Sequence, residues 1–252
     1  MKLTILGSGT CVPSKRRAPS GYLLESGSEI ILLDGGSGTL RQIANTGINY
    51  SSIATVMYTH FHVDHTAELL PLLFARKHDP APMNSEKLSI YGPEGMLEYI
   101  LRLDQFAGSW VYKNNDSITV KELKADDEII LGDCTVSCHS TYHQSNSIGY
   151  RFVADNGKIF SYTGDTDVGD RLLPLLQDAD IALAECSFPD SSKITGHLTP
   201  SELARIAQSA KVKKLLLTHL YPVMDSVEPI PIIQSLFKGN VEIIEDLNEY
   251  EV

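Results

Sequence analysis

The stretch that decides this fold is Thr59-His60-Phe61-His62-Val63-Asp64-His65. It places three imidazoles and a carboxylate within six consecutive residues, directly after the apolar stretch 53–58. Neutral imidazole and ionised carboxylate are the ligands that zinc and similar ions prefer. In an extended segment, residues two apart point to the same side, so we expect His60, His62 and Asp64 to converge, and His65 to face a second metal. The alternative is a polar turn that happens to be rich in histidine.

The bulk composition describes a globular chain with an acidic surface. The chain has 252 residues, of which 42% are hydrophobic, and a formal net charge of −11. That length accommodates one large α/β domain or two small ones. The negative charge argues against DNA and large RNA as partners unless a basic patch or bound metals offset it. The clearest basic cluster is Lys15-Arg16-Arg17, and such runs are usually solvated.

The chain also carries signals about its compartment. No apolar run approaches the roughly 20 residues of a membrane helix. Residues 1–7 lack the long apolar region of a signal peptide, so we expect a cytoplasmic protein outside any membrane. Cys134 and Cys138 have no second pair beside them, which argues against a thiolate zinc site. All four cysteines are predicted to be reduced and buried.

The predicted elements fall into two similar halves. Helices are expected at 40–46, 68–76, 96–106, 170–176 and 201–209, and apolar strands at 29–34, 53–58, 158–162, 181–184 and 214–218. Residues 30–34 resemble 159–165, and residues 56–60 resemble 216–219. Two ββα-like halves would pack sheet on sheet with helices outside, as one α/β (α+β) domain over residues 1–252. Ligands would then gather along one edge of the sandwich, where strands of both halves end.

A dinuclear site needs more ligands than one loop supplies. The further candidates are His139, His143, Asp165, His197 and His219. An imidazole at the end of a buried strand, as at His219, is unfavourable without a partner. Asp165 follows a glycine that lets the backbone approach closely, although an Asx turn would also account for this carboxylate. Spacing does not choose between His139 and His143, and a loop position beside a helix cap would equally account for His197.

Several motifs stand in one order along the chain. They are Leu6-Gly7-Ser8-Gly9-Thr10 with Pro13 and Arg17, Leu33-Asp34-Gly35-Gly36-Ser37-Gly38-Thr39, the HxHxDH run, His143 with Ser147-Ile148-Gly149-Tyr150-Arg151, Gly164-Asp165-Thr166, Glu185 with His197-Leu198-Thr199, and Leu217-Thr218-His219. This set resembles the ribonuclease Z-like phosphodiesterase branch of the metallo-β-lactamase superfamily, over nearly the whole chain. The resemblance implies the four-layer αββα sandwich of that superfamily.

The resemblance also implies two metal sites. One ion would be held by His60, His62 and His143, the other by Asp64, His65 and His219, and Asp165 would bridge both. His139 is then assigned to strand packing, and Asp34 becomes a carboxylate that fixes a ligand histidine or the loop backbone. Two divalent ions are expected, zinc above all, although the same ligands accept manganese, iron or nickel.

The implied chemistry is hydrolysis of a phosphodiester. Two ions about 3.5–4 Å apart lower the pKa of a bridging water and neutralise the charge of a phosphate. The hydroxide would attack phosphorus while Asp64 orients it or accepts its proton. In this family His197 is the candidate that protonates the leaving oxygen, and Glu185 would orient or charge His197. We therefore expect a binuclear metal-dependent phosphodiesterase.

One departure from the family concerns the substrate. Enzymes of this branch that mature transfer RNA carry a long arm between the Gly-Tyr-Arg strand and the Gly-Asp-Thr turn, whereas residues 152–163 leave room for one hairpin here. A small phosphodiester, such as a cyclic nucleotide or a nucleotide-like ester, therefore fits better than a large RNA. The alternatives are a transfer-RNA 3′-processing endonuclease, a lactone or thioester hydrolase and, last, a non-catalytic binding scaffold. A homodimer is also considered, because members of the branch tend to dimerise.

Overall fold

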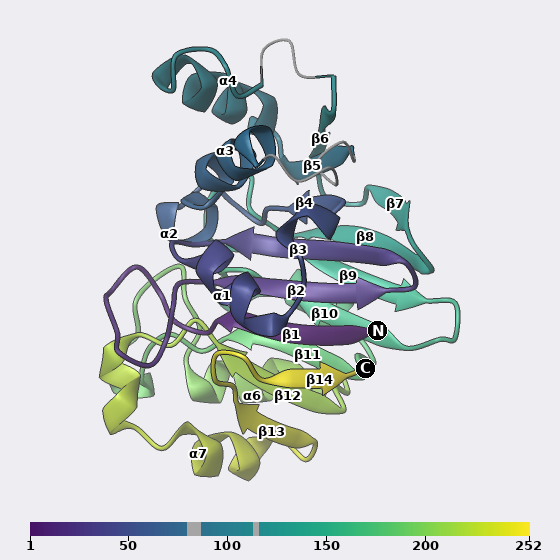
Figure 1. The fold of residues 1–252 in the computed structure, drawn as a ribbon. Coiled ribbons are helices and arrows are strands. Elements are labelled where there is room, and N and C mark those ends of the chain that lie inside the picture. The colour runs from purple at the N-terminus through teal and green to yellow at the C-terminus, as the bar shows by residue number, and fades with distance from the viewer. Residues whose placement is uncertain (80–86, 113–115) are drawn as a thin grey trace.

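Two mixed sheets lie face to face in the computed structural model, which describes residues 1–79, 87–112 and 116–252 (Figure 1). The first sheet has the order β14 (Glu249–Glu251), β1 (Lys2–Gly7), β2 (Gly21–Ser26), β3 (Glu29–Gly35), β4 (Thr55–Met57), β5 (Leu88–Pro93), β6 (Ile118–Leu123). The second has the order β13 (Asn240–Ile243), β12 (Lys214–Thr218), β11 (Ile181–Glu185), β10 (Ile159–Tyr162), β9 (Ile148–Ala154), β8 (Cys134–Ser140), β7 (Glu128–Leu131). The two chain ends meet at one place, because Val252 N–H donates to Met1 O (Figure 1).

Helices cover the outer faces of both sheets, which confirms the expected four layers. Beside the first sheet lie α1 (Thr39–Thr46), α2 (Val63–Thr66), α3 (Leu69–His78) and α4 (Met96–Phe106), and beside the second α5 (Leu172–Leu176), α6 (Pro200–Ser209) and α7 (Pro229–Leu236). Three short 3-10 helices are η1 (Tyr50–Ser52), η2 (Asp190–Ser192) and η3 (Pro222–Ser226). The sequence reasoning had not predicted α2, α7, β13 or β14. No helix of the described residues is long and apolar enough to cross a membrane.

Both sheets use the same pairing pattern. Strand pairs are antiparallel from β14 to β3 and parallel from β3 to β6. They are antiparallel from β7 to β10 and parallel from β10 to β13. The pattern makes β3 the counterpart of β10, as the similarity of residues 30–34 and 159–165 had indicated. The pattern also makes β4 the counterpart of β11. Residues 56–60 begin on β4, but the similar residues 216–219 begin on β12, so this similarity is not between equivalent strands.

Apolar side chains fill three layers. The central layer lies between the sheets and includes Ile5, Tyr22, Phe152 and Leu216, all fully buried. Two outer layers join each sheet to its helices. Cys134, Cys138 and Cys186 are buried, but the expectation of burial is wrong for Cys11, which is exposed. Cys11 is exposed because it lies in the loop after β1, outside the core.

Buried tyrosine hydroxyls join the two sheets through polar contacts. Tyr162 of the second sheet donates to Asp34 Oδ2 of the first, at 2.6 Å. Tyr150 of the second sheet donates to the carbonyl oxygen of Tyr58, also at 2.6 Å. Tyr22 of the first sheet lies 2.7 Å from Thr218 Oγ1 of the second. These contacts fix how the strand ends of one sheet lie over those of the other, because a buried polar group without a partner is costly.

The core assignment predicts unequal costs for the same substitution at two strand positions. Ile5→Ala empties a site that is 0% exposed between the sheets and should lower the free energy of unfolding by about 3 kcal/mol. Ile130→Ala, on β7 at 79% exposure, should change it by less than about 0.5 kcal/mol. Denaturant unfolding followed by circular dichroism measures both, and equal losses would contradict this packing.

Candidate metal centre

The polar side chains of the site follow the carboxyl ends of neighbouring parallel strands. Asp34 stands near the end of β3 and His60 comes after β4. In the second sheet, Asp165 follows β10, Glu185 ends β11 and His219 follows β12. Carboxyl ends of parallel strands share one edge of a sheet, and the two sheets bring their edges together here. The expected gathering of ligands along one edge is confirmed.

The opening loop divides its side chains between two clusters. The chain is extended up to His62 and then turns into α2 at Val63. His60 and His62 therefore face one cluster, while Asp64 and His65 face another. The expectation that Asp64 would converge with His60 and His62 is wrong, because it assumed that the extended alternation continued beyond Val63. The division observed is the one that the family resemblance implied.

Three overlapping groups of side chains are close enough to hold a metal ion. The third, Asp165, His197 and His219, shares one residue with each of the other two, and Asp165 lies between those two. The first comprises His60, His62, His143 and Asp165, and the second Asp64, His65 and His219. Asp165 Oδ2 lies 3.7 Å from His60 Nε2 and 3.6 Å from His143 Nε2. Its other oxygen, Oδ1, lies 3.2 Å from His65 Nε2 and 3.4 Å from His219 Nε2. One carboxylate thus presents an oxygen to each group.

Hydrogen bonds at Nδ1 fix which ring nitrogen each of four histidines presents to the centre. His65 Nδ1 lies 2.8 Å from Asp34 Oδ2, and His143 Nδ1 lies 2.8 Å from the carbonyl oxygen of Gly196. Those oxygens only accept, so Nδ1 carries the proton and Nε2 keeps its lone pair for a metal. His60 Nδ1 lies 3.0 Å from Thr59 Oγ1, a hydroxyl that itself donates to Asp34.

Ser187 supplies the matching contact for His219. Its Oγ lies 3.0 Å from His219 Nδ1 and 2.5 Å from Glu185 Oε2. A hydroxyl that donates to the Glu185 carboxylate can accept from His219 Nδ1–H, which leaves His219 Nε2 free for a metal. The sequence reasoning missed Ser187. Its spacing of two from Glu185 in an extended segment was the available signal, because such residues share one side.

The centre leaves polar atoms without partners in the protein. Among the described residues, His60 Nε2, His65 Nε2, Asp165 Oδ1 and His219 Nε2 are buried and accept or donate no hydrogen bond. Buried polar atoms are nearly always satisfied, so four such atoms facing one point indicate a missing partner. Imidazole nitrogen and carboxylate oxygen fit a divalent ion of the zinc type. The residues present therefore fit the metal centre that the resemblance implies.

Two imidazoles and the central carboxylate are held in the forms that bind a cation. Burial holds the pKa of His60 well below its ordinary value, and burial with the neighbouring His143 lowers the pKa of His62. Both rings are therefore neutral, as metal ligands must be. Burial alone would raise the pKa of Asp165, but the imidazoles of His219, His65 and His60 outweigh it and hold that pKa well below its usual range.

Two glycines let the loops of the site approach each other. Gly164 has φ +56°, and a Cβ there would lie 2.7 Å from Thr59 Cβ. Gly36 faces the backbone of α2, and its Cβ would lie 2.2 Å from Asp64 O. No side chain fits at either position, since real contacts of Cβ atoms are longer. These glycines allow the strand-end loops of both sheets to lie against the HxHxDH loop.

His197 and Glu185 form a pair beside the clusters. His197 Nδ1 lies 3.1 Å from Glu185 Oε1, and Glu185 is fully buried. Burial lowers the pKa of His197, but the hydrogen bond and charge of Glu185 outweigh it, so the pKa is raised. Glu185 also accepts from the backbone N–H groups of Thr166 and Leu198, which fixes its position. His197 also lines the cleft over the clusters. His139 lies apart from the clusters, on β8, where its Nε2 is 3.1 Å from Ser137 Oγ.

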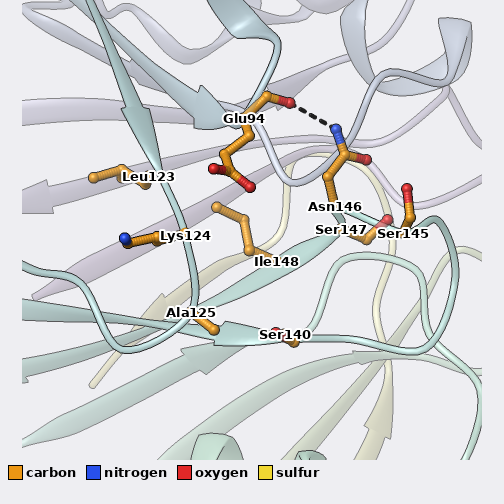
Figure 2. Close-up of a pocket in the computed structure, with 9 residues that line it drawn as sticks. All are labelled: Glu94, Leu123, Lys124, Ala125, Ser140, Ser145, Asn146, Ser147 and Ile148. Atoms are coloured by element: carbon orange, nitrogen blue, oxygen red, sulfur yellow. Dashed lines mark hydrogen bonds between the residues drawn. The ribbon is translucent and has the colours of Figure 1, made fainter.

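The loop that carries His143 is anchored to the first half of the chain. Asn146 Nδ2 donates to the carbonyl oxygen of Glu94 at 2.7 Å (Figure 2). Ile148 N–H donates to Thr59 O at 3.0 Å. Figure 2 shows a polar pocket around the first of these contacts, lined by residues of both halves. These contacts hold the loop of His143 against the first half of the chain, which supplies His60 and His62 to the same cluster.

An exposed cleft opens over the clusters. Its walls include Cys11, Val63, His197 and Tyr221 beside metal-cluster residues. Cys11 N–H donates to Asp64 Oδ2 at 3.0 Å and so orients that carboxylate. The sequence reasoning missed this backbone donor and Tyr221, since neither belongs to a motif of metal-binding side chains.

Comparison with known proteins identifies the family. A family profile described as "Beta-lactamase superfamily domain" matches residues 30–220. A protein named "Ribonuclease Z" from Listeria monocytogenes is 30% identical over 312 residues, covering 100% of this chain and 99% of the relative. "Probable metallo-hydrolase YhfI" from Bacillus subtilis is 29% identical over 248 residues, or 96% of each chain.

Solved structures show the same fold. The crystal structure of the Bacillus subtilis metallo-beta-lactamase fold protein YhfI matches with a TM-score of 0.87 at 27% identity, over 100% of this chain and 99% of that one. The short form of human tRNase Z matches with a TM-score of 0.80 at 24% identity, over 100% and 99% of the two chains. The chain therefore belongs to the metallo-β-lactamase superfamily, in its ribonuclease Z-like branch.

Proposed function

We propose that this metallo-hydrolase is a phosphodiesterase that acts on a small phosphodiester. The observation that carries the proposal is the shared Asp165, whose two oxygens face two ligand groups under one exposed cleft. Relatives that align over nearly the whole chain are named ribonuclease Z and a probable metallo-hydrolase, which supports hydrolysis of a phosphodiester.

Two divalent ions are proposed as cofactors. His60, His62 and His143 would hold one and Asp64, His65 and His219 the other, with Asp165 contributing to both. When bound, such a pair supplies an acidified water and neutralises the negative charge of a phosphate. Zinc is the proposed metal, because imidazole nitrogen and carboxylate oxygen suit it, and manganese, iron or nickel are the alternatives.

The protein's own groups would guide the protons of the reaction. A new bond forms between a water oxygen and phosphorus while the bond from phosphorus to the leaving oxygen breaks. Asp64, held by Cys11 N–H, would orient the attacking water or accept its proton. His197, whose pKa Glu185 raises, would give a proton to the leaving oxygen. The products are a phosphomonoester and an alcohol.

The small size of the substrate is supported by the hairpin of β9 and β10. These strands pair directly, with only residues 155–158 between them, so the arm expected of transfer-RNA-maturing enzymes has no place there. The Listeria alignment spans 312 residues against the 252 of this chain, so that relative carries residues with no counterpart here. The net charge of −11 also disfavours a long polyanion.

The proposed class of reaction can be tested directly. Protein loaded with zinc or manganese should hydrolyse bis-p-nitrophenyl phosphate and a cyclic nucleotide. Asp165→Ala should reduce both activities to the background rate, because each ligand group loses one carboxylate oxygen. The assay should include a lactone panel and a precursor transfer RNA. Hydrolysis of the lactones alone would refute the phosphodiesterase, and cleavage of the RNA alone would refute a small substrate.

His197 should matter for turnover and not for metal content. His197→Ala is expected to lower kcat on a cyclic nucleotide by roughly 10²–10⁴-fold, since a general acid contributes that much. His78→Ala, at the exposed end of α3, serves as the histidine control and should leave kcat unchanged. Metal analysis by inductively coupled plasma mass spectrometry should show equal stoichiometry in both variants. A fully active His197→Ala protein would remove the assigned proton donor.

Asp34 should act through the metal without being a ligand. Asp34→Asn keeps the shape of the side chain, but the amide cannot accept all the hydrogen bonds that the carboxylate accepts. We therefore expect metal affinity to fall about 10–100-fold. Competition with a chelator measures that affinity. Asp180→Asn, where the carboxylate pairs with Lys213 and Lys158 at the surface, is the matched control. Equal affinities in the two variants would show that Asp34 does not tune the site.

A further inference from the structure

One wall of the cleft is aromatic. Tyr221 lines the cleft and follows His219 by two residues. Phe188 stacks on Tyr221 with ring centroids 4.5 Å apart and an angle of 26° between the ring planes. Neither ring is part of the metal clusters or of the proton transfers proposed above. We call Tyr221 and Phe188 the aromatic wall.

The aromatic wall is held in one position. His197 contacts both rings edge to face, with centroids 5.5 Å from Phe188 and 5.9 Å from Tyr221. Tyr221 also contacts His219, at 5.8 Å between centroids, and is followed by Pro222 at the start of η3. A flat ring that is fixed in advance loses little entropy when a ligand stacks on it. The wall is therefore preorganised beside the reacting groups.

The HxHxDH loop adds an apolar side chain to the same cleft. Val63 lines the cleft from within the HxHxDH loop and is 67% exposed. Val12, next to the cleft residue Cys11 in sequence, and Val223, two residues after Tyr221, are also exposed. A valine exposed between metal ligands contributes nothing to the core. Together with Tyr221 it gives the cleft apolar surface beside the metal-binding groups.

The two kinds of side chain that line the cleft point to a substrate with two different parts. The metal-binding groups and His197 suit a phosphate, whereas an aromatic wall suits a flat ring, since offset-stacked rings attract each other. We propose that Tyr221, supported by Phe188, stacks on the nucleobase of a nucleotide phosphodiester and selects such substrates over simple alkyl phosphodiesters. This assignment rests on the proposed phosphodiesterase function and names the part of the substrate that the wall recognises.

A matched pair of esters isolates the contribution of the base. Thymidine 5′-(p-nitrophenyl phosphate) and methyl p-nitrophenyl phosphate release the same leaving group, but only the first carries a nucleoside. The wild-type protein should prefer the nucleoside ester in kcat/KM, and Tyr221→Ala should lower that preference about tenfold or more, since stacking on one base has such an effect. Phe188→Ala should lower it less. Tyr221→Phe should keep the preference, because the ring remains.

Phe106→Ala provides the control, because Phe106 is 85% exposed on α4 and lies outside the cleft residues. A second readout is binding without turnover. Isothermal titration calorimetry of the metal-loaded protein should show that adenosine 5′-monophosphate binds more tightly than ribose 5-phosphate, and that Tyr221→Ala removes the difference. Circular dichroism checks that the variant is folded.

The outcomes separate this inference from the proposed function. If both esters are hydrolysed with equal kcat/KM, or if Tyr221→Ala keeps the wild-type preference, the phosphodiesterase stands and the role of the aromatic wall is refuted. If neither ester, nor a cyclic nucleotide, is hydrolysed by the metal-loaded protein, the proposed function fails and the inference fails with it. A preference that also falls in Phe106→Ala would place base recognition outside the wall.

Discussion

The carboxylate of Asp34 is the contact on which the arrangement of the site depends. It is fully buried and accepts hydrogen bonds from Thr59 N–H, Thr59 Oγ1, His65 Nδ1 and Tyr162 Oη. The donors come from the ligand loop of the first sheet and from a strand of the second. Burial of the carboxylate without these hydrogen bonds would lower the stability of the fold, so all four donors must be in place when the site forms. Asp34 thereby joins the two sheets and aims His65 at the metal centre. Its φ of +51°, in the left-handed region, is a strained conformation that these contacts support.

Glu185 has a corresponding place in the second half. Its carboxylate contacts His197 directly and reaches His219 through Ser187. One buried acid thus positions both the histidine proposed to protonate the leaving oxygen and a histidine of the second ligand group. His219, like Asp34, has a positive φ, of +53°. In each half, a positive φ and a buried acid thus occur together at the shared edge of the sheets, where rigid positioning matters for metal binding and catalysis.

The ligands themselves could be predicted because their chemistry is unusual. Packing alone rarely places histidines so close together as in HxHxDH, or at the end of an apolar strand as at His219. The geometry between them was less predictable. Extended alternation placed Asp64 with His60, but the turn into α2 placed it in the other group. Ser187 and the N–H of Cys11 escaped notice because a hydroxyl or a backbone donor carries no distinctive pattern until its partner is known.

The sequence by itself determined the fold class and the candidates for metal-binding side chains, because strand periodicity and clustered imidazoles are local properties of the chain. Local patterns did not decide which of these side chains share a cluster. The family resemblance implied that division, and the tertiary structure shows it, with Asp165 between both clusters. Only the tertiary structure brought Phe188 and Tyr221 into one wall. Ser187, which precedes Phe188, and His219, which lies two residues before Tyr221, are 32 residues apart in the sequence. The physical reason is that these contacts join the ends of strands from different parts of the chain. Their distances depend on how the two sheets pack, and no local pattern encodes that packing.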